Sequence, residues 1–124
     1  MPRPSSPSVK VTYFNKPLVR RYLRRFVSEL VEKRPEVRRV VLFGSLARDD
    51  AVPGSDVDLI IILAASDKPF LDRISQYTPS PFPVGIEVFP YTQEELQVML
   101  QEGNPFIQRA LAEGITLFEA EEAS

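Results

Sequence analysis

The chain has 124 residues, 44% of them hydrophobic, a formal net charge of -2, and neither cysteine nor histidine. This length supports one compact domain around one core. The lack of cysteine excludes disulfides, thiolate nucleophiles and zinc-cysteine sites, and the lack of histidine removes the commonest general base. Proton transfer must therefore fall to carboxylates, tyrosine, lysine, serine or water.

Charge is distributed unevenly along the chain. Residues 1–48 carry twelve Lys and Arg against three Asp and Glu, whereas residues 49–124 carry three against fourteen. The two halves could neutralise each other within the fold or present faces of opposite sign to partners. No apolar run approaches membrane-spanning length and the N-terminus does not resemble a signal peptide, so we expect a cytoplasmic protein with no membrane association.

Taken in chain order, residues 1–14 are expected to form a flexible arm and residues 15–118 a single domain. The segment Pro17–Arg34 predicts a long amphipathic helix, because its apolar residues recur at helical spacing. These residues are Leu18, Val19, Tyr22, Leu23, Phe26, Val27, Leu30 and Val31. We expect this helix to pack on a sheet.

The opposite face of this helix carries four arginines, Arg20, Arg21, Arg24 and Arg25. They could form a basic patch for nucleic acid, an acidic partner or nucleotide phosphates. The favoured alternative is a solvated face in which Glu29 pairs with Arg25 and with Lys33 at i,i+4 spacing. No aromatic residues interleave with the arginines, which argues against direct nucleic-acid binding.

Two apolar runs, Val40–Phe43 and Leu59–Leu63, predict strands joined by a polar loop. The second run is entered through Asp56-Val57-Asp58, whose two carboxylates share one face of a strand at Cα positions roughly 6.6 to 6.8 Å apart. A hard cation such as Mg²⁺ relieves the repulsion between such carboxylates. The alternative is that these acids only open a strand after a turn.

The loop is too short for a long crossover helix, so the two strands are expected to be antiparallel. This arrangement makes Gly44-Ser45, at the end of the first strand, face the acid pair. Glycine lets the backbone approach a bulky anion closely, and Ser45 adds a hydroxyl donor. The pair therefore suits a phosphate, although Gly-Ser is also an ordinary turn.

After the second strand, residues 70–77 predict a short helix and Val84–Phe89 a third strand. Glu87 is the only acid in that otherwise apolar strand, and such a charge is costly unless it is paired or bound to metal. The alternative is an edge-strand glutamate that reaches solvent or an arginine of the first helix.

Two further helices are expected near the C-terminus. One begins at the capping box formed by Thr92 and Glu95, and the other begins at Asn104-Pro105 and ends at Gly114. Residues 119–124 are expected to form a frayed acidic tail. No residue of this part of the chain is predicted to be catalytic.

The string Phe43-Gly44-Ser45-Leu46-Ala47-Arg48, followed by Ser55-Asp56-Val57-Asp58-Leu59, resembles the signature of the polymerase-β-like nucleotidyltransferases and in particular their minimal nucleotidyltransferase family. Asp49 stands where many relatives carry glycine, and Glu87 stands where many carry aspartate. The resemblance implies an α+β fold, a small mixed sheet flanked by helices.

The resemblance also implies a mechanism, the transfer of AMP from ATP to an acceptor hydroxyl. Asp56, Asp58 and Glu87 would hold Mg²⁺ or Mn²⁺ and serve as the catalytic carboxylates. Gly44, Ser45 and Arg48 would bind the nucleotide.

Minimal nucleotidyltransferases are commonly paired with a helical toxin of the HEPN class, and some act as antitoxins by adenylylating a tyrosine of that partner. The leading hypothesis is therefore such an antitoxin. Two alternatives stay open, a catalytically weak antitoxin that acts by contact and a small-molecule adenylyltransferase. Homo-oligomerisation stays open as well.

Overall fold

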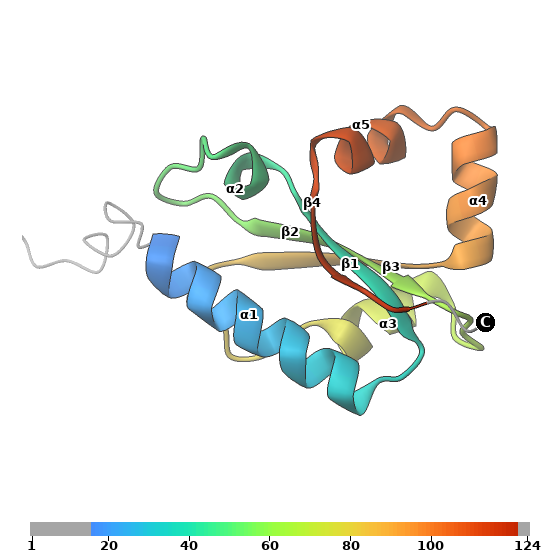
Figure 1. Cartoon of the computed structure of the whole chain (residues 1–124), viewed down its shortest axis with the longest axis horizontal. Helices are drawn as coiled ribbons and strands as arrows, with labels where there is room; N and C mark the ends of the chain where they lie inside the picture. The colour runs from blue at the N-terminus through green and yellow to red at the C-terminus, as the bar shows by residue number, and fades with distance from the viewer. Residues whose placement is uncertain (1–15, 122–124) are drawn as a thin grey trace, which may run out of the picture.

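The structure is a computed structural model that describes residues 16–121; the predicted arm of residues 1–14 and the end of the predicted acidic tail lie outside this range. The elements are α1 (Lys16–Lys33), β1 (Val37–Phe43), α2 (Ser45–Arg48), β2 (Val57–Leu63), α3 (Phe70–Tyr77), β3 (Ile86–Thr92), α4 (Gln93–Gln101), α5 (Pro105–Glu113) and β4 (Ile115–Glu119). The predicted α+β fold with a small mixed sheet is confirmed (Figure 1).

The four strands form one sheet in the order β3-β2-β1-β4. Strand β1 is antiparallel to both β2 and β4, whereas β2 and β3 are parallel. The predicted antiparallel pairing of the first two strands is therefore correct, and it places Phe43 opposite Asp58. As a result, the end of β1 and the start of β2 meet at one end of the sheet.

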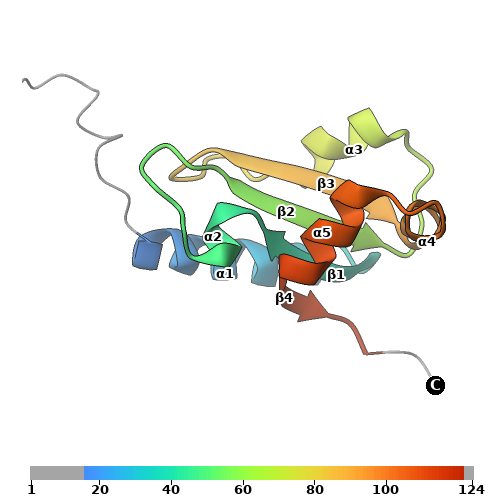
Figure 2. The same ribbon diagram turned by 90° about the horizontal axis from the view of Figure 1, so that it is seen from above.

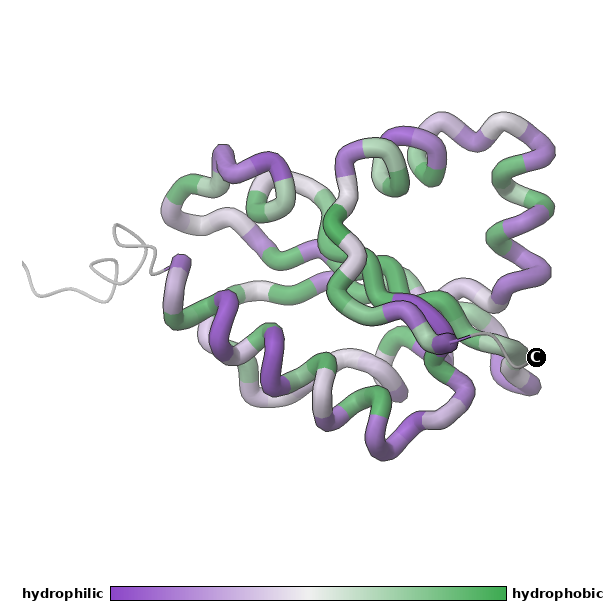
Figure 3. Tube along the Cα trace, viewed as in Figure 1, coloured by the Kyte–Doolittle hydropathy of each residue, from purple (hydrophilic) through white to green (hydrophobic). Residues whose placement is uncertain are grey.

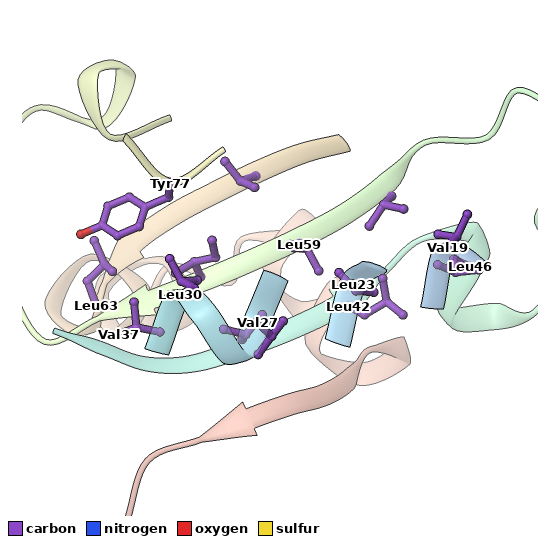
Figure 4. Close-up of a cluster of buried hydrophobic side chains, with 14 residues drawn as sticks. Val19, Leu23, Val27, Leu30, Val37, Leu42, Leu46, Leu59, Leu63 and Tyr77 are labelled. Atoms are coloured by element: carbon purple, nitrogen blue, oxygen red, sulfur yellow. The ribbon is translucent and has the colours of Figure 1, made fainter. Parts of the chain in front are cut away.

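Helices cover both faces of the sheet. Figures 1 and 2 show α1 and α3 on one face and α4 and α5 on the other. The core under α1 and α3 contains alternate strand residues such as Leu59, Ile61 and Leu63, and Figure 4 shows Leu59 and Leu63 among its side chains. The second core, under α4 and α5, uses the intervening residues Val41 and Ile60. This alternation follows from the two-residue period of a strand buried on both faces.

Helix α1 matches the prediction to within one residue at each end. Its buried residues Val19, Leu23, Val27 and Leu30 recur every three or four positions, which gives the helix one apolar stripe (Figure 3). The predicted ion pairs of Glu29 with Arg25 and Lys33 do not form. None of the ion pairs among residues 16–121 involves Glu29.

Strand β3 begins later than the predicted Val84, at Ile86. It also ends later than the predicted Phe89, since it continues through Pro90 to Thr92. Proline lacks an N–H donor and is tolerated in a strand that pairs on one side only. Strand β3 is such a strand, because among the described residues it lies at the edge of the sheet and pairs with β2 alone.

The capping box that follows β3 is confirmed. The backbone N–H of Glu95 donates to the Thr92 hydroxyl at 3.1 Å, and the Thr92 N–H donates to the Glu95 carboxylate at 2.9 Å.

A buried arginine ties α3 to β3 and α4. The Arg73 side chain is 5% exposed and donates to both carboxylate oxygens of Glu95, at 2.7 and 3.0 Å. It also donates to the carbonyls of Lys68 and Pro90, at 2.8 and 3.0 Å. This set of bonds satisfies a charge that would otherwise be costly to bury.

None of the helices within residues 16–121 is long and apolar enough to cross a membrane.

Candidate active site

Three carboxylates approach one another where β2 and β3 begin. Asp58 shares the sheet face of Ile60, which packs under α4 and α5, because strand side chains alternate. Its neighbour across the parallel ladder is Glu87, and Asp56 precedes β2 by one residue. The predicted third carboxylate therefore lies directly beside the acid pair on the adjacent strand.

The electrostatics of Asp58 reflect this crowding. Burial, the nearby charge of Glu87, a hydrogen bond with Glu87 and the charge of Asp56 raise the pKa of Asp58 to about 6, and the Arg48 guanidinium opposes this shift. Asp56 and Glu87 are themselves exposed. A cation placed among the three groups would therefore relieve a repulsion that is present in the fold.

Gly44 leaves room for the Asp58 carboxylate. A Cβ atom at this position would overlap Asp58 Oδ2. The backbone, at φ 79° and ψ -158°, also occupies a region that is essentially restricted to glycine. Gly44 is therefore required both by its conformation and by its contact, as the predicted approach of the loop to the acid pair implies.

A second glycine was not predicted to matter. A Cβ atom at Gly85 would overlap Asp56 Oδ1, and the Gly85 carbonyl accepts from the Val57 N–H at 2.9 Å. A glycine inside an apolar strand pattern often indicates a close approach, so the signal was available in the sequence.

The donor set fits a hard divalent cation, because it consists of carboxylate oxygens, two of which lie against glycines with no room for a Cβ. Within residues 16–121, however, no three acidic side chains are grouped closely enough to form a three-ligand metal site. Asp56, Asp58 and Glu87 are thus brought to one place without forming a complete coordination shell.

The phosphate-binding residues of the prediction lie in and before the short helix α2. Gly44 is its N-cap, Ser45 begins it and Arg48 ends it. Asp49 follows with a left-handed φ of 65°, and its carboxylate pairs with Lys16 at 3.3 Å. The predicted departure at Asp49 thus falls on a residue whose backbone suits glycine, since aspartate tolerates the left-handed region and glycine adopts it freely.

The Arg48 guanidinium is held by two acids. It donates to Asp50 and to Glu113 on α5, at 3.2 Å in each case, and these bonds raise its pKa. Glu113 also accepts from Arg109 at 3.1 Å. Helix α5 therefore reaches the edge of the site, although no residue of the C-terminal part was predicted to contribute.

A cavity of about 390 Å³ lies beside this network, between α2 and α5. Gly44 and Arg48 line one side, and Phe106 and Arg109 line the other. The Phe106 ring contacts the rings of Phe43 and Phe89, with centroids 5.6 and 5.3 Å away. The site thus combines carboxylates, two guanidinium groups and an aromatic wall.

A mixed sheet with an acid pair entering one strand and a Gly-Ser turn ending its antiparallel neighbour defines the nucleotidyltransferase class. Residues 23–111 match the model of the nucleotidyltransferase domain family, and the chain belongs to this family. The predicted resemblance to the nucleotidyltransferases and the predicted enzyme class are thereby confirmed. No curated protein matches the sequence.

Solved structures support the same fold. A protein from Sulfolobus solfataricus described as a nucleotidyltransferase superposes with a TM-score of 0.59 at 14% identity, covering 96% of this chain and 93% of its own. A toxin-antitoxin crystallised with AMP-PNP gives 0.55 at 15% identity, with 79% and 74% covered. A mutant of the toxin-antitoxin MntA-HpeT gives 0.53 at 15% identity, with 80% and 73% covered.

Proposed function

We propose that this protein transfers AMP from ATP to an acceptor hydroxyl in a reaction that depends on Mg²⁺ or Mn²⁺. We further propose that it serves as the antitoxin of a helical HEPN-type toxin and that the acceptor is a tyrosine of this toxin. The observation that carries the chemical part is the pairing of Asp58 with Glu87 across the β2–β3 ladder, with Asp58 against Gly44 and Asp56 one residue before β2. The biological part is supported by the likeness of the fold to toxin-antitoxin proteins.

In this proposal each polar residue of the site has a distinct task. Asp56, Asp58 and Glu87 would hold the cation, which when bound neutralises triphosphate charge. Gly44 and Ser45 would hold the β and γ phosphates through the backbone N–H groups and the serine hydroxyl.

The transfer itself would exchange the phosphoanhydride bond between the α and β phosphates of ATP for a phosphoester bond to the acceptor. The acceptor oxygen attacks the α phosphorus while its proton passes to a Glu87 carboxylate oxygen. The bond to the β-phosphate oxygen breaks and pyrophosphate leaves, with Arg48 as its counter-charge. The 3.2 Å bond from Arg48 to Glu113 keeps the guanidinium at the edge of the site before substrate arrives.

Label transfer tests this function directly. The protein, Mg²⁺ and a cell extract are incubated with ATP labelled at the α or at the γ phosphorus. The proposal expects α-label on a protein and γ-label in pyrophosphate only. An Asp58→Asn variant should lose transfer, whereas Asp72→Asn, which removes an exposed acid on α3, should retain it.

A second function, an antitoxin that acts by contact alone, is favoured by one observation. The three carboxylates do not form a complete three-ligand group within the described residues. Under this alternative the protein binds its partner and neutralises it, but transfers no α-label. Neutralisation that survives in Asp58→Asn would support contact over catalysis.

A further inference from the structure

The outer surface of α1 carries positive charge that the fold does not neutralise. Arg21, Arg24 and Arg25 are exposed, and no arginine of this helix takes part in the ion pairs found among residues 16–121. Arg25 lies over the Tyr22 ring instead, with its guanidinium carbon 5.9 Å from the centroid. Unpaired cations on one helix face leave a charge available to a partner.

A groove runs between α1 and β4, with a volume of about 540 Å³. Arg20 and Arg24 line it from α1, and none of its lining residues within 16–121 is acidic. Its floor is formed by the buried core residues Leu23, Val27 and Leu42, from α1 and β1, and the partly exposed apolar side chains at its surface are Val31, Leu117 and Phe118. The groove therefore combines an apolar lining with positive charge on its α1 side.

The position of the groove leaves it open to a second molecule. Within residues 16–121, strand β4 is an edge of the sheet and pairs with β1 alone. Figure 1 shows α1 and β4 side by side along the same part of the sheet, and Figure 2 shows β4 at its outer margin. Helix α1 covers the sheet face opposite α5 and the carboxylates, and it approaches the candidate active site at Arg20, which donates to the Leu46 carbonyl of α2 at 3.5 Å.

The combination of charge and apolar lining selects the kind of partner. An amphipathic helix places apolar side chains at i, i+3, i+4 and i+7 into a groove, and acids beside that stripe reach cations at its margin. A nucleic acid would pair with the arginines but would leave the aliphatic lining unfilled. A neutral helix would leave Arg20 and Arg24 without counter-charges.

We propose that the α1–β4 groove binds an acidic amphipathic helix of a partner protein, with the apolar stripe of that helix in the groove and its carboxylates on Arg20 and Arg24. This interaction goes beyond nucleotidyl transfer and does not depend on it.

A synthetic helix tests the proposal on the full chain. The probe is a fluorescein-labelled 16-residue peptide with leucine at the groove-facing positions and glutamate or alanine elsewhere, titrated by fluorescence anisotropy. Arg24→Glu should weaken binding at least about tenfold, because one attraction becomes a repulsion. Arg21→Glu is the matched control, since it reverses a charge on the same helix outside the groove lining, and should change affinity less than about twofold.

Two further readouts fix the place and nature of the occupant. Backbone amide chemical shifts should move at Val31, Thr116 and Leu117 when the peptide binds. A peptide with lysine in place of glutamate should bind at least about tenfold more weakly.

Several results would overturn the proposal. These are the absence of peptide binding, equal affinity for the lysine peptide, equal losses in Arg24→Glu and Arg21→Glu, or shifts confined to other elements. Tighter binding of a single-stranded RNA oligonucleotide than of the peptide would assign the surface to nucleic acid instead. A dimer in sedimentation equilibrium that Arg24→Glu dissociates would make the occupant a second copy of this chain.

Discussion

Replacing Gly44 with alanine tests how closely the loop is fitted to Asp58. The backbone at this residue lies in a glycine-only region, where another residue costs about 1 to 3 kcal/mol. The new Cβ would also overlap Asp58 Oδ2, and overpacking of this kind costs about 1 to 3 kcal/mol. We expect Gly44→Ala to lower the free energy of unfolding by about 3 kcal/mol and the melting temperature by roughly 10 °C.

Gly54→Ala is the matched control for this change. Gly54 also has a positive φ, of 92°, but a Cβ there would meet nothing within 4 Å. It should therefore lose only the strain contribution, about 1 kcal/mol. Both variants would be measured by urea denaturation and by thermal melting.

A double-mutant cycle separates the two contributions at Gly44. In the Gly44→Ala/Asp58→Ala variant the overlapping carboxylate is gone, so the loss should be smaller than the sum of the single losses by about 1 kcal/mol or more. Additive losses, or a Gly44→Ala effect no larger than that of Gly54→Ala, would refute the inferred contact.

Three further predictions concern the stability of other parts of the fold. Arg73→Met should lower the free energy of unfolding by about 2 to 3 kcal/mol, because it removes the donor to Glu95 Oε2 and to the carbonyls of Lys68 and Pro90 and leaves Glu95 with only its capping bond from Thr92. Arg109→Met, which breaks an ion pair on an exposed arginine, should cost under about 1 kcal/mol in the same urea titration. In metal-free buffer, the free energy of unfolding of the protein, compared with that of Asp58→Asn, should fall as the pH rises from about 4 through 6. The reason is that the pKa of Asp58 is raised in the folded state, so its protonated form favours folding. A difference that grows in favour of the wild type as the pH rises would contradict this. Asp49→Gly should raise the free energy of unfolding by up to about 1 kcal/mol by relieving the left-handed backbone, and a destabilised variant would show that the Asp49 carboxylate matters more than its backbone.

The features that the sequence predicted correctly depend on local patterns. The antiparallel pairing of β1 with β2 follows from two apolar runs and the short loop between them, and the register of Phe43 with Asp58 brings the Gly-Ser turn to the acids. Helix α1 follows from its apolar periodicity. The capping box of Thr92 lies within four consecutive residues, so it needed no tertiary information.

The features that the sequence missed depend on contacts between distant segments. Glu113 lies 65 residues from Arg48, and nothing in the pattern of α5 indicates that the two would pair. The role of Gly85 required the knowledge that β3 pairs with β2 in parallel beside Asp56. The helical spacing of Glu29 permitted ion pairs that did not form, because exposed pairs gain little from a fixed geometry.

Calorimetric titration with ATP, in the presence and absence of Mg²⁺, tests the assignment of the carboxylates at the start of β2. We expect binding that requires Mg²⁺ and is lost in Asp56→Asn/Asp58→Asn. It should persist in Asp67→Asn/Asp72→Asn, which makes the same charge change at two exposed acids of the β2–α3 loop and α3. Absence of binding to the folded wild-type protein, or equal binding by both double variants, would contradict the assignment of these carboxylates as the metal and nucleotide site.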